Sequence, residues 1–184
     1  MTNVIYSPDA DLIFLGLTLQ DHKLYVMREE FQPGRADITS PSGNPYVNRE
    51  IVFIDINRLR YLLISQFRQS IPFNFNYRRF IEDWVFMCFA VGNDFLPCLP
   101  CFEIRSNAID KITGLLVSLF KKSRRHITNN GDIDLNALRE FFVECSERED
   151  DFLIEKKSNL LSVRKRMNLP LKEEEEFDLN SDAG

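Results

Sequence analysis

The chain has 184 residues, of which 44% are hydrophobic and 16 are phenylalanine. This length fits one domain, or a small domain with a tail, and the composition provides for a sizeable core. The net charge of −5 at pH 7 excludes a protein that binds nucleic acid through a large basic excess. The net charge does not exclude a nuclease, because metal-binding carboxylates add negative charge that bound cations offset.

Apolar stretches in this chain are too short to span a bilayer. The segments Asp11–Leu19 and Trp84–Val91 are apolar, but a membrane-spanning helix needs about 20 such residues. The start of the chain does not resemble a signal peptide. We therefore expect a soluble intracellular protein that does not enter a membrane.

The cysteines include one CxxC pair, formed by Cys98 and Cys101. A structural zinc site needs four ligands, usually two such pairs, and neither His22 nor His126 is spaced to complete one. Reduced thiols inside a cell are the favoured interpretation, ahead of zinc binding or redox chemistry.

The first thirty residues have the pattern of an α/β unit. Val4–Tyr6 is a short apolar run with β-branched residues, which predicts the end of a strand. A turn at Ser7–Asp9 precedes a helical pattern over Leu12–Leu17, and acidic residues stand where a helix N-terminus favours them. Leu24–Arg28 predicts a second strand, so this region forms strand, turn, helix and strand.

The middle of the chain predicts a loop and then helices. Residues 32–48 are rich in Pro, Gly, Ser and Asn, which is typical of a loop, and a short apolar run follows at Ile51–Ile54. Apolar residues recur at helical spacing over Leu59–Phe67. Phe80–Val91 is almost wholly apolar, which predicts a buried helix that stops at Gly92.

The last third of the chain also predicts helices, followed by a tail. One helix is expected over Ala108–Leu119 and a turn at Asn129–Gly131. Asp134 is a candidate cap for a long helix that continues past Phe152. Residues 168–184 are acidic and polar, which predicts disorder. The fold class is thus an α/β remnant followed by a mainly α-helical domain.

Two aspartates stand at the junction between the first strand and the first helix. Asp9 and Asp11 flank Ala10, and open α/β folds place ligands at this edge of the sheet. Carboxylates held this close repel one another unless a cation lies between them. A metal-dependent nuclease needs such carboxylates, because its metal ions hold the attacking and leaving oxygens of a phosphodiester. A D-x-D pair is also common in helix caps, so spacing alone leaves that alternative open.

Asp94 is a third candidate metal ligand. It follows Gly92 and Asn93 and has Phe95 and Leu96 after it. In apolar surroundings an ionised carboxylate needs a partner, and a metal ion is one such partner. The alternative is a carboxylate that caps a helix or accepts hydrogen bonds from loop amides.

Other polar and aromatic residues have less specific interpretations. Glu82 and Asp83 interrupt the apolar run, where a helix-cap role is favoured over support of a metal ligand. Trp84 is a candidate for stacking on a base, but in so apolar a run a core position is favoured. The basic cluster Lys121–Arg125 is more typical of a solvated helix end than of a phosphate contact.

Long strings of the sequence resemble the Xrn-type 5′→3′ exoribonucleases. They are YSPDADLIFLGL, REEF and IEDWVFMCFAVGNDFLPCLPCFEIRSNAID, in the order of the family. The likeness runs from the first residues to about Leu119 and more weakly to Asp151. VFMCF and FEIRSNAID are similar to the nuclear Rat-type branch, which implies a place in the nucleus, with the cytoplasm as the alternative. Cys98 stands where the family often has His.

The resemblance implies an activity and a set of ligands. Xrn-type enzymes degrade RNA from a 5′-monophosphate end to mononucleotides, with Mg²⁺ as the metal and Mn²⁺ as a possible substitute. Their DAD acids match Asp9 and Asp11, and their GNDFLP acid matches Asp94. These three residues are therefore the predicted catalytic and metal-binding residues.

The resemblance also implies a division of the chain and a missing partner. Residues 1–31 match the end of the α/β nuclease domain, 32–48 a loop, 49–167 the helical domain of the core and 168–184 a tail. Further metal-binding acids and the 5′-phosphate pocket of the family belong to the preceding half of the nuclease core. We expect that half to be supplied in cis or in trans. The competing hypothesis is a catalytically incomplete RNA-binding or scaffold module.

Overall fold

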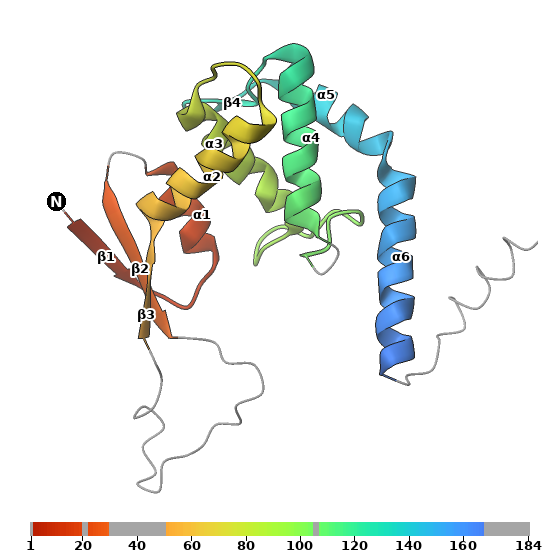
Figure 1. Ribbon diagram of the computed structural model, residues 1–184, viewed down its shortest axis with the longest axis horizontal. Coiled ribbons are helices and arrows are strands. Elements are labelled where there is room, and N and C mark those ends of the chain that lie inside the picture. The colour runs from red at the N-terminus through yellow and green to blue at the C-terminus, as the bar shows by residue number, and fades with distance from the viewer. Residues whose placement is uncertain (1, 20–21, 30–50, 105–106, 168–184) are drawn as a thin grey trace, which may run out of the picture. The chain divides into compact units, whose positions relative to one another are not determined.

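The computed structural model of the chain describes residues 2–19, 22–29, 51–104 and 107–167 (Figure 1). A small sheet at the start is followed by helices, which confirms the predicted fold class. The elements are β1 (Thr2–Tyr6), α1 (Asp11–Thr18), β2 (Lys23–Glu29), β3 (Ile51–Asp55), α2 (Ile56–Ser70), α3 (Tyr77–Cys88), η1 (Phe89–Val91), α4 (Ala108–Ser123), β4 (Thr128–Asn129), β5 (Asp132–Ile133), α5 (Leu135–Ser146) and α6 (Glu149–Arg166). The predicted loop at 32–48 and tail at 168–184 lie outside the described residues.

Two compact units make up the chain. The first comprises Met1–Met87 and Arg124–Asp134, and the second comprises Cys88–Ser123 and Leu135–Gly184. Each unit is therefore discontinuous in sequence. Within the described ranges, no helix is both long enough and apolar enough to cross a bilayer.

The three-stranded sheet of the first unit has the order β1-β2-β3. β1 and β2 are parallel, with Thr2 opposite Lys23 and Tyr6 opposite Met27. This arrangement confirms the predicted strand, turn, helix and strand. β3 pairs with β2 in the antiparallel direction, so the apolar run at Ile51–Ile54, which sequence grouped with the helical domain, is a strand of this sheet.

One face of the sheet packs against α1 and α2. Alternate residues of β2, Leu24 and Val26, are 3% and 0% exposed, as expected for a strand with one buried face. Gly16 of α1 allows the close approach: a Cβ at this position would lie 2.9 Å from Cδ2 of Leu24 and 3.4 Å from Cγ1 of Ile56. A side chain at this position would force the Leu24 side chain to shift.

Aromatic rings fill the space between α2 and α3. The rings of Phe67 and Phe80 meet edge to face with their centroids 4.9 Å apart. Trp84 lies 6.2 Å from Phe67 and 5.9 Å from Phe14, and it is only 6% exposed. The prediction that Trp84 is a core residue is confirmed. Offset and edge-to-face ring pairs add to the stabilisation that burial supplies.

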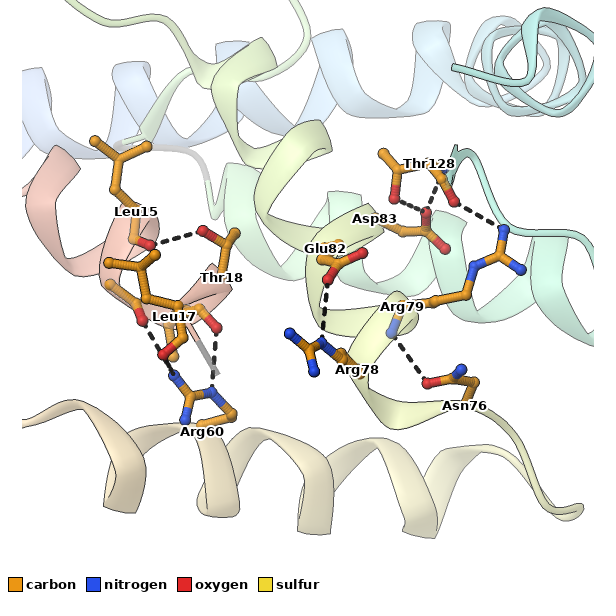
Figure 2. A network of polar contacts seen from close by, with 12 residues as sticks. Leu15, Leu17, Thr18, Arg60, Asn76, Arg78, Arg79, Glu82, Asp83 and Thr128 are labelled. Carbon is orange, nitrogen blue, oxygen red and sulfur yellow. Dashed lines mark hydrogen bonds and ion pairs between the residues drawn. The ribbon is translucent and has the colours of Figure 1, made fainter. Parts of the chain in front are cut away.

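Asp83 anchors a distant segment of chain to α3 (Figure 2). It is 2% exposed, and its Oδ2 lies 2.6 Å from Nδ1 of His126. Its Oδ1 accepts hydrogen bonds from the backbone N–H of Thr128 at 2.7 Å and from the Thr128 hydroxyl at 2.8 Å. Arg79 of the same helix donates to the Thr128 carbonyl at 2.9 Å. The helix-cap interpretation of Asp83 is wrong, because this residue lies inside α3.

The segment bound by Asp83 continues into the short β4–β5 hairpin. Asn129 pairs with Asp132, which leaves Asn130 and Gly131 as the turn, with φ of 53° and 95°. Positive φ at both central positions is typical of the tight hairpin turn that Asn-Gly favours. The predicted turn at Asn129–Gly131 is confirmed.

The second unit is built from α4, α5 and α6. Its core includes Ile112 and Leu115 of α4 and Phe141 of α5, all fully buried. The prediction of one long helix past Phe152 is wrong, because α5 ends at Ser146 and α6 begins at Glu149. Three acidic residues open α6, and negative charge favours a helix N-terminus there over a continuous helix.

Replacement of Asp83 by alanine tests the role of this buried carboxylate. Asp83→Ala leaves the Thr128 N–H and hydroxyl without their acceptor, and we expect the free energy of unfolding to fall by about 3 kcal/mol. Urea unfolding followed by circular dichroism measures the change. Glu82→Ala is the matched control, because among the described residues Glu82 has a long 3.8 Å ion pair with the half-exposed Arg78, and its loss should cost less than about 0.5 kcal/mol. Equal losses for both variants would contradict the assignment.

Candidate active site

Asp9 and Asp11 lie on the turn that joins β1 to α1. The backbone N–H of Ser7 donates to the Met27 carbonyl at 3.0 Å, which extends the pairing of the parallel strands by one residue. Asp9 is exposed in the turn, and Asp11 is the partly exposed first residue of α1. The two aspartates thus occupy the carboxyl edge of a parallel strand pair, where open α/β sheets place ligands.

Local hydrogen bonds fix the turn between these aspartates. The Asp9 N–H donates to Oγ of Ser7 at 3.1 Å, and Oδ1 of Asp9 accepts the N–H of Asp11 at 2.9 Å. A carboxylate that accepts an amide two residues onward is a common helix-initiating turn. Asp9 therefore has the predicted alternative role of helix initiation, yet this role engages only one of its two oxygens among the described residues.

Glu29 is a further carboxylate at the same edge, and sequence reasoning overlooked it. It ends β2, and its Oε1 accepts a hydrogen bond from the Tyr6 hydroxyl at 3.1 Å. The parallel register places Tyr6 opposite Met27, which brings the ends of the two strands together. The sequence signal that could have identified Glu29 as a site residue was its position directly after the predicted strand Leu24–Arg28.

Asp94 belongs to the second unit and lies in the loop after η1. Asn93, rather than Asp94, organises this loop: its Oδ1 accepts the N–H of Phe95 at 2.9 Å and of Leu96 at 2.8 Å. Asp94 is exposed, and the Phe95 ring beside it is 89% exposed. The expectation of apolar surroundings for Asp94 is therefore wrong within this chain, because the neighbouring apolar side chains point to solvent.

Gly92 sets the direction of the Asp94 loop. Its backbone has φ 93° and ψ 155°, a conformation that is essentially restricted to glycine. A Cβ at Gly92 would lie 2.8 Å from the backbone nitrogen of Cys98. The Leu99 N–H donates to the Ala90 carbonyl at 3.0 Å, which closes the loop back onto η1.

The structure brings Asp9 and Asp11 together in the first unit and carries Asp94 on the second. Among the described residues, no group of three or more His, Cys, Asp or Glu side chains is arranged to hold a metal ion. Carboxylate oxygens are nevertheless the donors that Mg²⁺ prefers. The chemistry of Asp9 and Asp11 therefore fits part of a magnesium site.

The cysteines of the CxxC pair have different surroundings. Cys98 is exposed and Cys101 is buried, and Sγ of Cys101 lies 3.9 Å from Sγ of Cys145. Burial raises the pKa of Cys145 to about 12, with a further contribution from Cys101. Burial also raises the pKa of Cys88 to about 12. Such thiols stay protonated at neutral pH and are weak nucleophiles.

The basic cluster at the end of α4 makes contacts within each unit. Lys122 lies 3.2 Å from the buried carboxylate of Glu144, which Arg148 also contacts at 3.1 Å. Arg124 places its guanidinium carbon 4.3 Å from the centre of the Phe73 ring. Lys122 and Arg124 remain exposed, as the interpretation as a solvated helix end predicts, while each also contacts a residue of its own unit.

The chain belongs to the Xrn family. Residues 74–183 match the family model described as the Xrn1 helical domain, which is more than half of the chain. Residues 1–30 match the model described as the XRN 5'-3' exonuclease N-terminus. The two matches lie in the order in which the resembling strings occur, so the predicted family is confirmed.

Relatives named 5'-3' exoribonuclease 2, or a homolog of it, occur in distant organisms. The chain is 33% identical over 175 residues to the 5'-3' exoribonuclease 2 homolog of Drosophila melanogaster, covering 80% of this chain and 19% of the relative. It is 33% identical over 169 residues to 5'-3' exoribonuclease 2 of Gallus gallus, covering 77% and 18%. For the protein of that name in Kluyveromyces lactis, identity is 31% over 181 residues, covering 90% and 18%. The chain thus spans less than one fifth of the length of these relatives.

Substitution of Gly92 tests the conformational constraint on the Asp94 loop. Gly92→Ala should lower the free energy of unfolding by about 2 kcal/mol or more, because alanine is strained at this φ and meets the Cys98 backbone. The matched control is Gly114→Ala in α4, where a Cβ meets nothing within 4 Å. That change should instead raise stability by up to about 1 kcal/mol. Urea unfolding of both variants decides, and a stabilised Gly92→Ala protein would contradict the constraint.

Thiol labelling tests the surroundings of the cysteines. At pH 8 iodoacetamide should modify Cys98 first, because it is exposed, whereas Cys88 and Cys145 have pKa values of about 12. Their reactive thiolate grows only as the pH rises toward 12. Peptide mass spectrometry over time, with a urea-unfolded sample as the control, measures each site. Labelling of Cys88 or Cys145 in the folded protein as fast as Cys98 would contradict the burial of their thiols.

Proposed function

We propose that this chain is a segment of a 5′→3′ exoribonuclease of RNA processing and turnover. It would act on RNA with a 5′-monophosphate and release mononucleotides by metal-dependent hydrolysis. The observation that carries this proposal is the family match over both parts of the chain. The relatives named 5'-3' exoribonuclease 2 support the reaction, and the Rat-type strings support a place in the nucleus.

Asp9, Asp11 and Asp94 are the proposed metal ligands. Bound Mg²⁺, or Mn²⁺ in its place, supplies the charge that activates a water molecule and stabilises the phosphodiester oxygens during hydrolysis. Asp9 and Asp11 share one turn, and the hydrogen bond from the Asp11 N–H to Oδ1 of Asp9 holds that turn. Among the described residues this bond engages only Oδ1 of Asp9, which leaves Oδ2 for a cation. Asp94 is presented by a loop that Asn93 and Gly92 shape.

The outer face of the sheet supports the proposal that a further half of the nuclease core binds here. On the face of the sheet that α1 and α2 do not cover, apolar residues of β1 and β3 are exposed. Their exposed fractions are 53% for Val4, 57% for Tyr6, 55% for Ile51 and 59% for Phe53. The strand register places Tyr6 and Phe53 on either side of Met27, so these side chains share one face. A contiguous exposed apolar face is typical of a binding surface. The preceding half of the nuclease core, in cis or in trans, is the proposed occupant.

Degradation of 5′-labelled RNA tests the function. The chain is combined with the preceding half of the Drosophila melanogaster relative, and Mg²⁺ is added with RNA that carries either a 5′-monophosphate or a 5′-hydroxyl. We expect stepwise release of mononucleotides from the monophosphate RNA only. Asp94→Asn should lower the rate by at least about 100-fold, the upper range for changes that merely support a metal ligand. Asp110→Asn, an exposed acid of α4, is the control and should keep the rate.

The outcomes separate the enzyme from its alternatives. An Asp94→Asn protein as active as wild type would contradict the role of Asp94. Equal rates on the two RNA ends would contradict the 5′-monophosphate requirement. Binding of RNA without degradation, by a folded complex of the two halves, would favour the scaffold module.

A further inference from the structure

Arg60 of α2 is a buried cation whose hydrogen bonds converge on one end of α1 (Figure 2). It is only 8% exposed. Its Nε donates to the Leu17 carbonyl at 3.1 Å, and its Nη2 donates to the Gly16 carbonyl at 3.0 Å. The Leu19 carbonyl lies 3.5 Å from the same Nη2. A charge this deeply buried is costly unless it is well compensated, so these bonds matter for the fold.

The carbonyls that bind Arg60 belong to the last turn of α1, where the Gly16 carbonyl also accepts the Leu19 N–H at 3.2 Å. The last four carbonyls of a helix have no N–H of the next turn to accept, and the helix dipole makes this end negative. The last turn of α1 contains no basic residue of its own. Arg60 supplies the missing cation from the neighbouring helix, and its planar fork reaches carbonyls of Gly16 and Leu17 at once.

The opposite end of the same helix presents the candidate metal ligands. α1 has eight residues and is therefore roughly 12 Å long. Asp11 is the first residue of this short helix, and its N–H donates to Oδ1 of Asp9, which joins both aspartates to α1. Gly16 seats α1 closely on Leu24 and Ile56, while Arg60 restrains its position along the axis. A change at Arg60 is therefore transmitted to Asp9 and Asp11.

We propose that Arg60 is a positioning residue for the Asp9 and Asp11 carboxylates. It acts through α1, whose last-turn carbonyls it binds. This inference rests on the proposed function of these aspartates as metal ligands. Without the guanidinium fork, the end of α1 loses its restraint, and the two carboxylates bind a cation less tightly. At saturating metal the site still forms, so the maximal rate changes little.

Arg60→Lys is the test variant, because lysine keeps the charge but cannot reach several carbonyls in one plane. Arg58→Lys, an exposed position of the same helix, is the matched control. The complex with the preceding half of the Drosophila melanogaster relative is titrated with Mn²⁺, and bound metal is read by electron paramagnetic resonance. We expect Arg60→Lys to raise the half-saturating Mn²⁺ concentration about tenfold. The rate at saturating Mn²⁺ should stay within about twofold, and Arg58→Lys should match wild type.

Amide hydrogen exchange gives a second readout that does not depend on metal. The Asp11 N–H bonds to Asp9 Oδ1 and the Ile13 N–H bonds to the Ala10 carbonyl, so both report the N-terminal end of α1. Their exchange should be faster in Arg60→Lys and unchanged in Arg58→Lys. A protein that merely unfolds more often would instead lose rate with no change in metal affinity. Arg60→Gln replaces the lysine variant if circular dichroism shows that the latter does not fold.

Each outcome decides the inference. Unchanged half-saturation in an active Arg60→Lys complex overturns it, and so does unchanged exchange at Asp11 and Ile13. If the wild-type complex binds no Mn²⁺, the proposed function of the aspartates fails. In that case the exchange data alone decide whether Arg60 controls the end of α1 that carries them.

Discussion

The parallel pairing of β1 with β2 is the constraint on which the rest of the first unit depends. Parallel strands cannot be joined by a tight turn, so the chain must cross from the end of one to the start of the other. α1 makes this crossing, packs closely on Leu24 through Gly16, and starts at the carboxyl edge of the sheet. Asp9 and Asp11 stand at this edge because the crossing begins there.

Buried charges hold the elements around this sheet and within the second unit. Asp83 binds the segment at His126 and Thr128 to α3, and Glu144 is compensated by Lys122 and Arg148. The partners of Asp83 are more than 40 residues away in the sequence. Glu144 has one partner in α4, Lys122, and one four residues further along the chain, Arg148. Because an unpaired buried charge is costly, these contacts select one arrangement of the helices over others that would bury the same apolar residues.

The candidate metal ligands lie on two turns of opposite character, one in each unit. The Asp9 turn is short, polar and fixed by its own side chains, whereas the Asp94 loop depends on the backbone of Gly92 and presents exposed apolar residues. Exposed apolar side chains lie beside Asp94 and, separately, on the outer face of the sheet, and contiguous exposed apolar surface is typical of a binding surface.

Sequence by itself determined the strand, turn, helix and strand of the first thirty residues, the core position of Trp84 and the family. These features depend on local periodicity and on long motif strings, which neighbouring residues specify. Only the tertiary structure decided that Ile51–Asp55 is a strand, that Asp83 binds Thr128 and that Arg60 holds α1. Each of these contacts joins residues at least 20 positions apart, so no local sequence pattern indicates them. The exposure of Asp94 was decided in the same way, because its environment depends on how the Gly92 backbone directs the loop.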